Sequence, residues 1–120
     1  MPSDTTHVQI AERFEAVADH LERHRYYDWE LVARFYAALH YVEAHFGRDR
    51  RHLNTHGQRD RALGDPKHPL WPVYSHYCCL RDQSEDVRYR GKEFDDPRLT
   101  PLRASYAEVR SRCRALLGLS

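Results

Sequence analysis

Apolar residues recur every three or four positions along four segments of this chain. The segments span residues 10–21, 32–46, 73–87 and 102–117. Such spacing places apolar side chains on one face of a helix. No segment alternates apolar and polar residues over six positions, so no β-strand is expected, and a shorter helix is predicted at about 56–63. The sequence therefore predicts an all-α fold, an up-and-down bundle of four long helices plus one short helix.

Glycines and capping residues predict where these helices begin and end. Glycine favours helix C-termini because it adopts the left-handed conformation at little cost. Four glycines follow helical segments in this way: Gly47, Gly64, Gly91 and Gly118. Asp28 is expected to cap a helix that opens at Trp29. Thr100-Pro101 is expected to open the last helix, which leaves residues 92–99 as an irregular connection.

The second helical segment has an additional stripe on its other side. The stripe consists of small residues and one tyrosine: Ala33, Ala37, Ala38, Tyr41 and Ala44. A helix that is apolar on both sides is usually buried. Two interpretations follow, a central helix of the bundle or a helix with one side against a second subunit. The central helix is the simpler of the two.

Composition narrows the class of protein. A chain of 120 residues, 41% of them hydrophobic, is sized for a single domain over 1–120. Its frequent aromatic residues and balanced charge argue against a disordered chain. It has no apolar run of the length that a membrane helix needs and no export leader. Three cysteines, two of them adjacent, make a poor disulfide framework, which favours a reducing, cytoplasmic location.

Charge is distributed unevenly behind a net value of +1. Residues 45–68 carry six basic and three acidic side chains and four of the nine histidines, whereas residues 1–44 carry four basic and eight acidic ones. The basic residues are 17 Arg against two Lys. Arginine suits bidentate phosphate contacts, although GC-rich codon usage would give the same ratio.

The order of local patterns is more specific than any one of them. Residues 34–44 read RFYAALHYVEA, residues 56–63 read HGQRDRAL, and residues 84–89 read SEDVRY, before an amphipathic helix that ends in Leu116-Leu117. Over about residues 8–117 this succession resembles the HEPN superfamily of small helical bundles. The resemblance implies an up-and-down bundle that forms a homodimer. It also implies either a metal-independent ribonuclease, including toxins paired with a nucleotidyltransferase-like antitoxin, or a non-catalytic RNA-binding or scaffold module. Neither kind needs a cofactor.

Catalytic members of that superfamily use an R-x(4–6)-H motif, with one copy from each subunit. Arg51-x4-His56 fits this spacing, but so do Arg13-x6-His20 and other pairs, as expected for a chain rich in both residues. Chemistry favours the first pair, because it straddles a predicted helix N-terminus whose backbone N–H groups favour an anion.

Metal-free RNA cleavage needs a base for the 2′-OH and a cation for the transition state. In the catalytic hypothesis His56 is the acid/base and Arg51 the transition-state cation, while Arg59 and Arg61 bind phosphate. The plainer interpretation of Arg59 and Arg61 is a charged helix face in water.

Three residues of the SEDVRY segment are expected to be structural. Arg88, beneath Tyr89, is predicted to form a salt bridge to the acidic N-terminal helices. Ser84 is expected to bond its own backbone or to permit close packing.

His40, in the second helical segment, is expected to make a hydrogen bond in the core.

Histidine spacing raises the question of a metal site. His52-x3-His56 and His20-x3-His24 have the i,i+4 spacing of helical ligands. The chain contains no C-x-x-C and no H-E-x-x-H motif, so no metal is predicted.

Two functions remain open. One is an RNA- or nucleotide-phosphate-interacting protein, a ribonuclease of toxin type in its sharpest form. The other is a non-catalytic dimerisation or protein-interaction module. The basic, histidine-rich segment 45–68 favours the first. The second is favoured because no histidine follows His76. The last helix therefore cannot supply the histidine of an R-x(4–6)-H motif.

Overall fold

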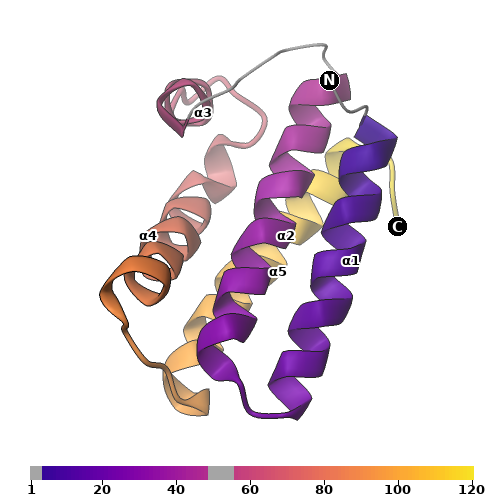
Figure 1. The fold of residues 1–120 in the computed structure, drawn as a ribbon. Coiled ribbons are helices and arrows are strands. Elements are labelled where there is room, and N and C mark those ends of the chain that lie inside the picture. Colours follow the sequence, from indigo (N-terminus) through magenta and orange to yellow (C-terminus); the bar gives the residue numbers. More distant parts are fainter. Residues whose placement is uncertain (1–3, 49–55) are drawn as a thin grey trace.

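Four long helices run alternately up and down, and a short helix lies across one end of the bundle (Figure 1). The computed structural model describes residues 4–48 and 56–120, with the backbone alone for His56. The elements are α1 (Asp4–Arg23), α2 (Tyr27–Arg48), α3 (His56–Leu63), the 3-10 helix η1 (Trp71–Val73), α4 (Tyr74–Arg90) and α5 (Asp96–Leu116). No strand occurs within the described residues, so the predicted all-α bundle of four long helices and one short helix is confirmed.

Helix α2 is the centre of the bundle. It packs against α1, α4 and α5. Phe35 and Phe46 on its first apolar stripe are buried, and so are Ala37 and Tyr41 on its second. The second stripe faces α1 at Tyr41, whose hydroxyl donates a 3.1 Å hydrogen bond to Glu15. The prediction that α2 is a central helix is therefore confirmed.

Some predicted helix ends are confirmed. Gly91 follows α4 with φ 66°, and its N–H and that of Lys92 both donate to the Asp86 carbonyl. Gly118 follows α5 with φ 75°. Gly47 does not end a helix, because α2 continues to Arg48.

The predicted start of α5 is wrong. Its N-cap is Asp95, whose carboxylate accepts the Arg98 N–H at 2.9 Å, so Thr100 and Pro101 lie inside the helix. Residues 92–99 are thus helical in their second half. The earlier start buries Leu99 completely, and this adds a full turn to the apolar face of α5.

Asp28 does not have its predicted capping role either. Helix α2 already begins at Tyr27, and the Asp28 carboxylate accepts the Phe94 N–H at 2.5 Å. The side chain therefore fastens the α4–α5 connection to the start of α2.

A buried carboxylate near the start of α2 joins three helices of the bundle. Glu30 of α2 is inaccessible to solvent. It accepts hydrogen bonds from Arg34 Nε at 2.7 Å and from Arg103 Nε and Nη2 at 2.8 Å. The two guanidinium groups also reach Glu22 of α1 and Asp96 of α5. Each charge in this network therefore has a partner of opposite sign.

A second, partly buried cluster joins α1 to α5 nearer the middle of the bundle. Glu15 accepts hydrogen bonds from the Tyr41 and Tyr106 hydroxyls and from Arg110 Nε. Burial, then the bond to Glu15, raises the pKa of Tyr106 well above its usual range, so the phenol stays protonated as a donor. No helix within residues 4–48 and 56–120 is long and apolar enough to cross a membrane.

Candidate functional site at the α3 end of the bundle

Helix α3 is held to the bundle by side chains from two other helices. Arg59 Nη1 lies 2.5 Å from Glu43 Oε1 of α2, and both residues are buried. Asp60 accepts from Arg81 Nη1 of α4 at 2.6 Å. Leu63 is 1% exposed and belongs to the core. A helix of eight residues has little stability of its own, so these contacts fix its position.

Arg59 is therefore turned inward. Sequence analysis assigns it to phosphate binding, but the structure pairs its guanidinium with a buried carboxylate. We assign it the role of a positioning residue, because it fixes the first turn of α3. Arg61, the second predicted phosphate-binding residue, is exposed and has no ion-pair partner among the described residues. The predicted catalytic Arg51 lies outside the described residues, as does the side chain of His56, whose backbone begins α3.

Two histidines meet beside the Arg59–Glu43 pair. His7 Nδ1 of α1 and His40 Nδ1 of α2 are 3.0 Å apart, and their rings stack with centroids at 5.2 Å. Burial lowers the pKa of His7, against the opposing charge of Glu43. Burial and then the neighbouring His7 lower the pKa of His40. One ring donates and the other accepts, so the accepting imidazole is neutral, and the lowered pKa values favour the neutral form of the other as well. The predicted core hydrogen bond of His40 is confirmed.

More aromatic and imidazole rings lie at the same end of the bundle. His45 and Phe46, near the end of α2, contact the ring of His68, with centroids 5.4 Å and 5.5 Å apart respectively. His68 Nδ1 accepts the Leu70 N–H at 3.0 Å, which shapes the turn between α3 and α4. The fold thus gathers His7, His40, His45 and His68 from three separate parts of the chain. We call the end of the bundle formed by these histidines, Glu43 and α3 the α3 end.

Tyr77 of α4 lies beneath this end. Burial raises the pKa of Tyr77 to about 12. The charges of Arg59 and Arg81 act in the opposite direction, and that of Glu43 raises the pKa further. Glu43, His7 and Tyr77 were not among the residues that sequence analysis selected. A signal for Glu43 was present, because a carboxylate one turn after His40 interrupts a helix that is apolar on both sides.

The SEDVRY segment differs from its prediction at Arg88. No carboxylate of the described residues lies at ion-pair distance from Arg88. Its guanidinium instead donates to the Tyr36 hydroxyl at 3.0 Å and lies over the rings of Phe35, Tyr36 and Tyr89. The predicted salt bridge of Arg88 is thus wrong, since other arginines, Arg34 and Arg110 among them, take the acidic groups of α1.

Ser84 is fully buried, and its hydroxyl has no hydrogen-bond partner among the described residues. Of its two predicted roles, close packing of helices fits this position and a bond to its own backbone does not. Tyr89 is 74% exposed.

No three His, Cys, Asp or Glu side chains of the described residues gather as metal ligands. His52, which has helical spacing to His56, lies outside those residues. Cys113 is buried, and burial raises its pKa to about 12, so this thiol stays protonated at neutral pH. It is a packing residue of α5.

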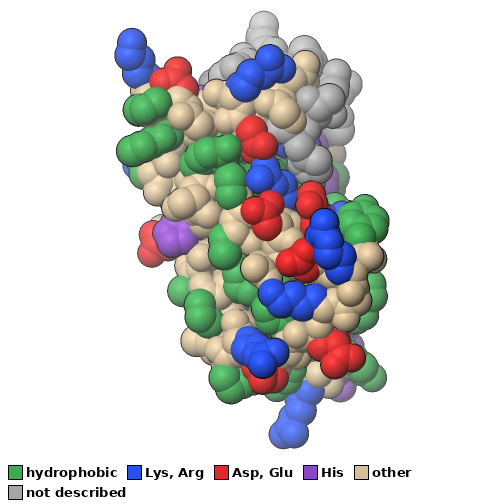
Figure 2. All heavy atoms as spheres, turned by 90° about the vertical axis from the view of Figure 1, so that its left-hand side faces the viewer, with side chains coloured by type: hydrophobic (Ala, Val, Ile, Leu, Met, Phe, Trp, Pro, Cys, Tyr) green, Lys and Arg blue, Asp and Glu red, His purple; other side chains and the backbone are tan. Residues whose placement is uncertain are grey.

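Charges of both signs are interspersed on the α3–α4 side of the molecule, and Figure 2 shows no continuous basic area there. Nonspecific nucleic-acid binding depends on such an area. Any phosphate contact on this side would therefore be made by a few local cations.

The histidine pair predicts that stability falls in mild acid. The folded protein holds His7 and His40 below their ordinary pKa of 6.5, whereas the unfolded chain protonates them near that value. Their effect on stability is absent well above pH 6.5. As the pH drops below 6.5, the unfolded state binds more protons and the free energy of unfolding decreases.

Urea unfolding at pH 7.5 and 5.5 measures this dependence. We expect His40→Phe to reduce the loss between the two pH values, because it removes one of the two titrating rings. The exposed His24→Gln should retain the full loss. An identical pH dependence in wild type and His40→Phe would show that the pair does not contribute.

The positioning role of Arg59 makes a separate prediction. Arg59→Met leaves Glu43 buried without its guanidinium, so α3 should open more readily. We expect amide hydrogen exchange in α3 to become at least about tenfold faster, which corresponds to roughly 1.4 kcal/mol of opening free energy. Adding Glu43→Gln should restore part of the protection, and the exposed Arg61→Met should change little. Unchanged exchange in Arg59→Met would mean that the ion pair does not hold α3.

No protein-family model, curated protein or solved structure matches this chain with significant similarity.

Proposed function

We propose that this chain is a HEPN-like domain that engages RNA at the α3 end and cleaves it without a metal, as a homodimer. The observation that carries the proposal is the buried Glu43–Arg59 ion pair, because it joins the first turn of α3 to α2. His56 stands at the start of that turn. The ordered patterns at residues 34–44, 56–63 and 84–89 support the HEPN assignment. A toxin role beside a nucleotidyltransferase-like antitoxin belongs to the same proposal.

In this proposal the roles are divided among four residues. His56 takes the proton from the ribose 2′-OH, whose oxygen attacks the adjacent phosphorus. The bond from phosphorus to the 5′ oxygen breaks, and this oxygen leaves with a proton from water. Arg51 stabilises the charge that develops on the phosphate oxygens. Arg61, exposed on α3, contacts a neighbouring phosphate. Arg59 is a positioning residue in this proposal: its guanidinium pairs with Glu43 and so fixes the first turn of α3.

The test is cleavage of labelled structured RNA in the presence of EDTA. We expect cleavage by the wild-type protein, with products ending in 2′,3′-cyclic phosphate, since the attacking group is the neighbouring 2′-OH. Arg61→Ala should weaken the apparent affinity for RNA and reduce the salt dependence of binding. Absence of cleavage over a broad set of RNAs would reject the ribonuclease form of the proposal.

An interaction module is the second candidate, and one surface favours it. Ile10, Phe14 and Val17 line an open hollow on α1 of about 310 Å³, and Val17 is 48% exposed. The Phe14 ring continues onto α2 through Tyr36, with centroids 5.5 Å apart. Exposed apolar area of this kind is common at protein–protein contacts. Sedimentation of wild type and Val17→Asp tests it: concentration-dependent association that the variant loses, without RNA cleavage, would favour this candidate.

A further inference from the structure

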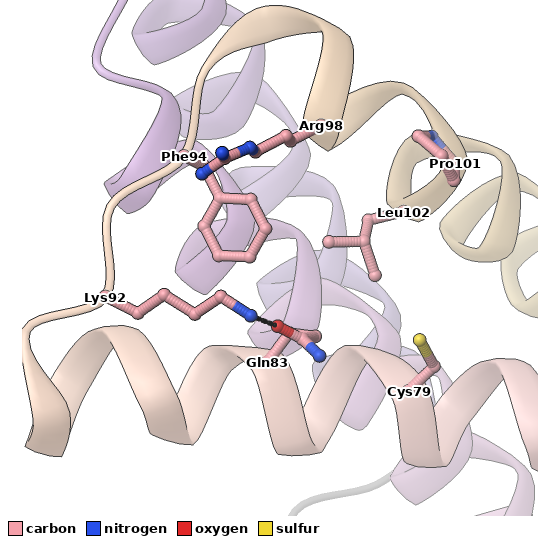
Figure 3. A pocket seen from close by; sticks show the side chains of 7 residues that line it. All are labelled: Cys79, Gln83, Lys92, Phe94, Arg98, Pro101 and Leu102. Atoms are coloured by element: carbon pink, nitrogen blue, oxygen red, sulfur yellow. Dashed lines mark hydrogen bonds between the residues drawn. The ribbon is translucent and has the colours of Figure 1, made fainter.

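A cleft lies between α4, the α4–α5 connection and the start of α5 (Figure 3), and none of its lining residues belongs to the α3 end. It has a volume of about 420 Å³, within the range of small-molecule sites. Leu102 and the ring of Phe94 form its apolar wall, and the sulfur of Cys79 faces the same opening (Figure 3).

Two cations border this cleft, and none of the residues that line it is acidic. Lys92 Nζ donates to the neutral Gln83 amide at 2.6 Å and lies 5.1 Å from the Phe94 ring centroid. No carboxylate of the described residues is within ion-pair distance of Lys92. Among residues 4–48 and 56–120, Arg98 has one carboxylate within ion-pair distance, that of Asp95, at 3.9 Å from its Nε. The buried arginines Arg34 and Arg59 lie against carboxylates at shorter distances, whereas Lys92 and Arg98 are exposed, so both cations at the cleft are open to an anion from solution.

The backbone around the cleft is held in place before any ligand binds. Gly91, with φ 66°, turns the chain back over α4, so that Lys92 comes beside Gln83. The bond from the Phe94 N–H to Asp28 then fixes the ring against the bundle. A cleft that is already formed loses little conformational entropy on binding.

We propose that this cleft binds a small monocarboxylate with an apolar tail. The carboxylate lies between Lys92 and Arg98, and the tail runs over Phe94 and Leu102 towards Cys79. The proposal concerns a different surface from the α3 end, so it stands or falls independently of RNA cleavage.

Octanoate is the probe, and the alkylation rate of Cys79 by iodoacetamide is the readout. Cys79 is exposed, whereas Cys113 is buried, and peptide fragmentation distinguishes Cys79 from Cys78. A ligand of this size in an open site has a Kd on the order of 0.1–1 mM. At about 5 mM octanoate we therefore expect alkylation of Cys79 to slow by at least about threefold.

Matched ligands separate charge from apolar contact. Acetate and inorganic phosphate carry the charge without the tail, and octylammonium carries the tail with the opposite charge. None of these three should slow alkylation appreciably. Slowing by octylammonium equal to that by octanoate would overturn the assignment of an anion site, and so would full slowing by phosphate alone.

The chain supplies a matched control variant, because it has only two lysines. Lys92→Met removes the charge at the cleft and keeps an apolar stem, and Lys67→Met makes the same change elsewhere on the surface. We expect Lys92→Met to lose the protection by octanoate and Lys67→Met to retain it, with equal melting temperatures. Protection that persists in Lys92→Met, or its absence in wild type, would reject the proposal.

Discussion

Glu30→Ala should lower the free energy of unfolding by about 3–5 kcal/mol. Glu30 is fully buried, and two guanidinium groups, those of Arg34 and Arg103, donate to its carboxylate. Removing the carboxylate leaves both cations partly buried with only peripheral acidic partners. Small domains are stable by about 5–15 kcal/mol, so the variant would lose a large share of its stability.

Urea unfolding of wild type and Glu30→Ala at pH 7 measures this effect. Asp86→Ala provides the comparison, because Asp86 pairs with Arg90 on an accessible surface of α4, where the Arg90 side chain is 69% exposed. Such i,i+4 pairs contribute roughly 0.3–0.5 kcal/mol. A change of less than 1 kcal/mol in Glu30→Ala would mean that Glu22 and Asp96 compensate the two arginines without Glu30.

His56→Ala should reduce RNA cleavage by about 10²–10⁴-fold, the usual contribution of a general acid/base. The change should leave the melting temperature nearly unaltered, because Arg59, Asp60 and Leu63 supply contacts that hold α3 and stay in place in the variant. Rates are compared in EDTA with enzymes purified identically.

His20→Ala is the matched control for that experiment. Arg13-x6-His20 also satisfies the R-x(4–6)-H spacing, but it lies within α1, and His20 is exposed. We expect full activity in this variant. Equal cleavage by wild type and His56→Ala would remove His56 from the catalytic role, whatever the origin of the activity.

The apolar periodicity was sufficient to predict the helices, since each long helix buries one stripe or two. The start of α5 was misjudged because the sequence offers two similar openings, Asp95 followed by Pro97 and Thr100 followed by Pro101. Both satisfy local capping rules. Only the packing of Leu99 into the core decides between them, and packing is a contact between distant parts of the chain.

Charged residues in the interior were the other limit of prediction. Patterning rules assign Glu30, Glu43 and Arg59 to the solvent, yet all three are buried. Each has a partner on another helix: Arg103 lies 73 positions from Glu30, and Glu43 lies 16 positions from Arg59. A local reading of the sequence cannot choose among 17 arginines for each carboxylate. For the same reason it assigned a salt bridge to Arg88, which contacts aromatic rings.

The location of the RNA contact tests the central claim most directly. A short RNA with 2′-O-methyl groups cannot be cleaved through its 2′-oxygen, so it can be titrated into ¹⁵N-labelled protein while amide shifts are recorded. The account predicts that the largest shifts occur in α3 and in the last turn of α2, near Glu43 and His45. Shifts confined to the Ile10–Val17 face of α1, or no shifts at all, would contradict it.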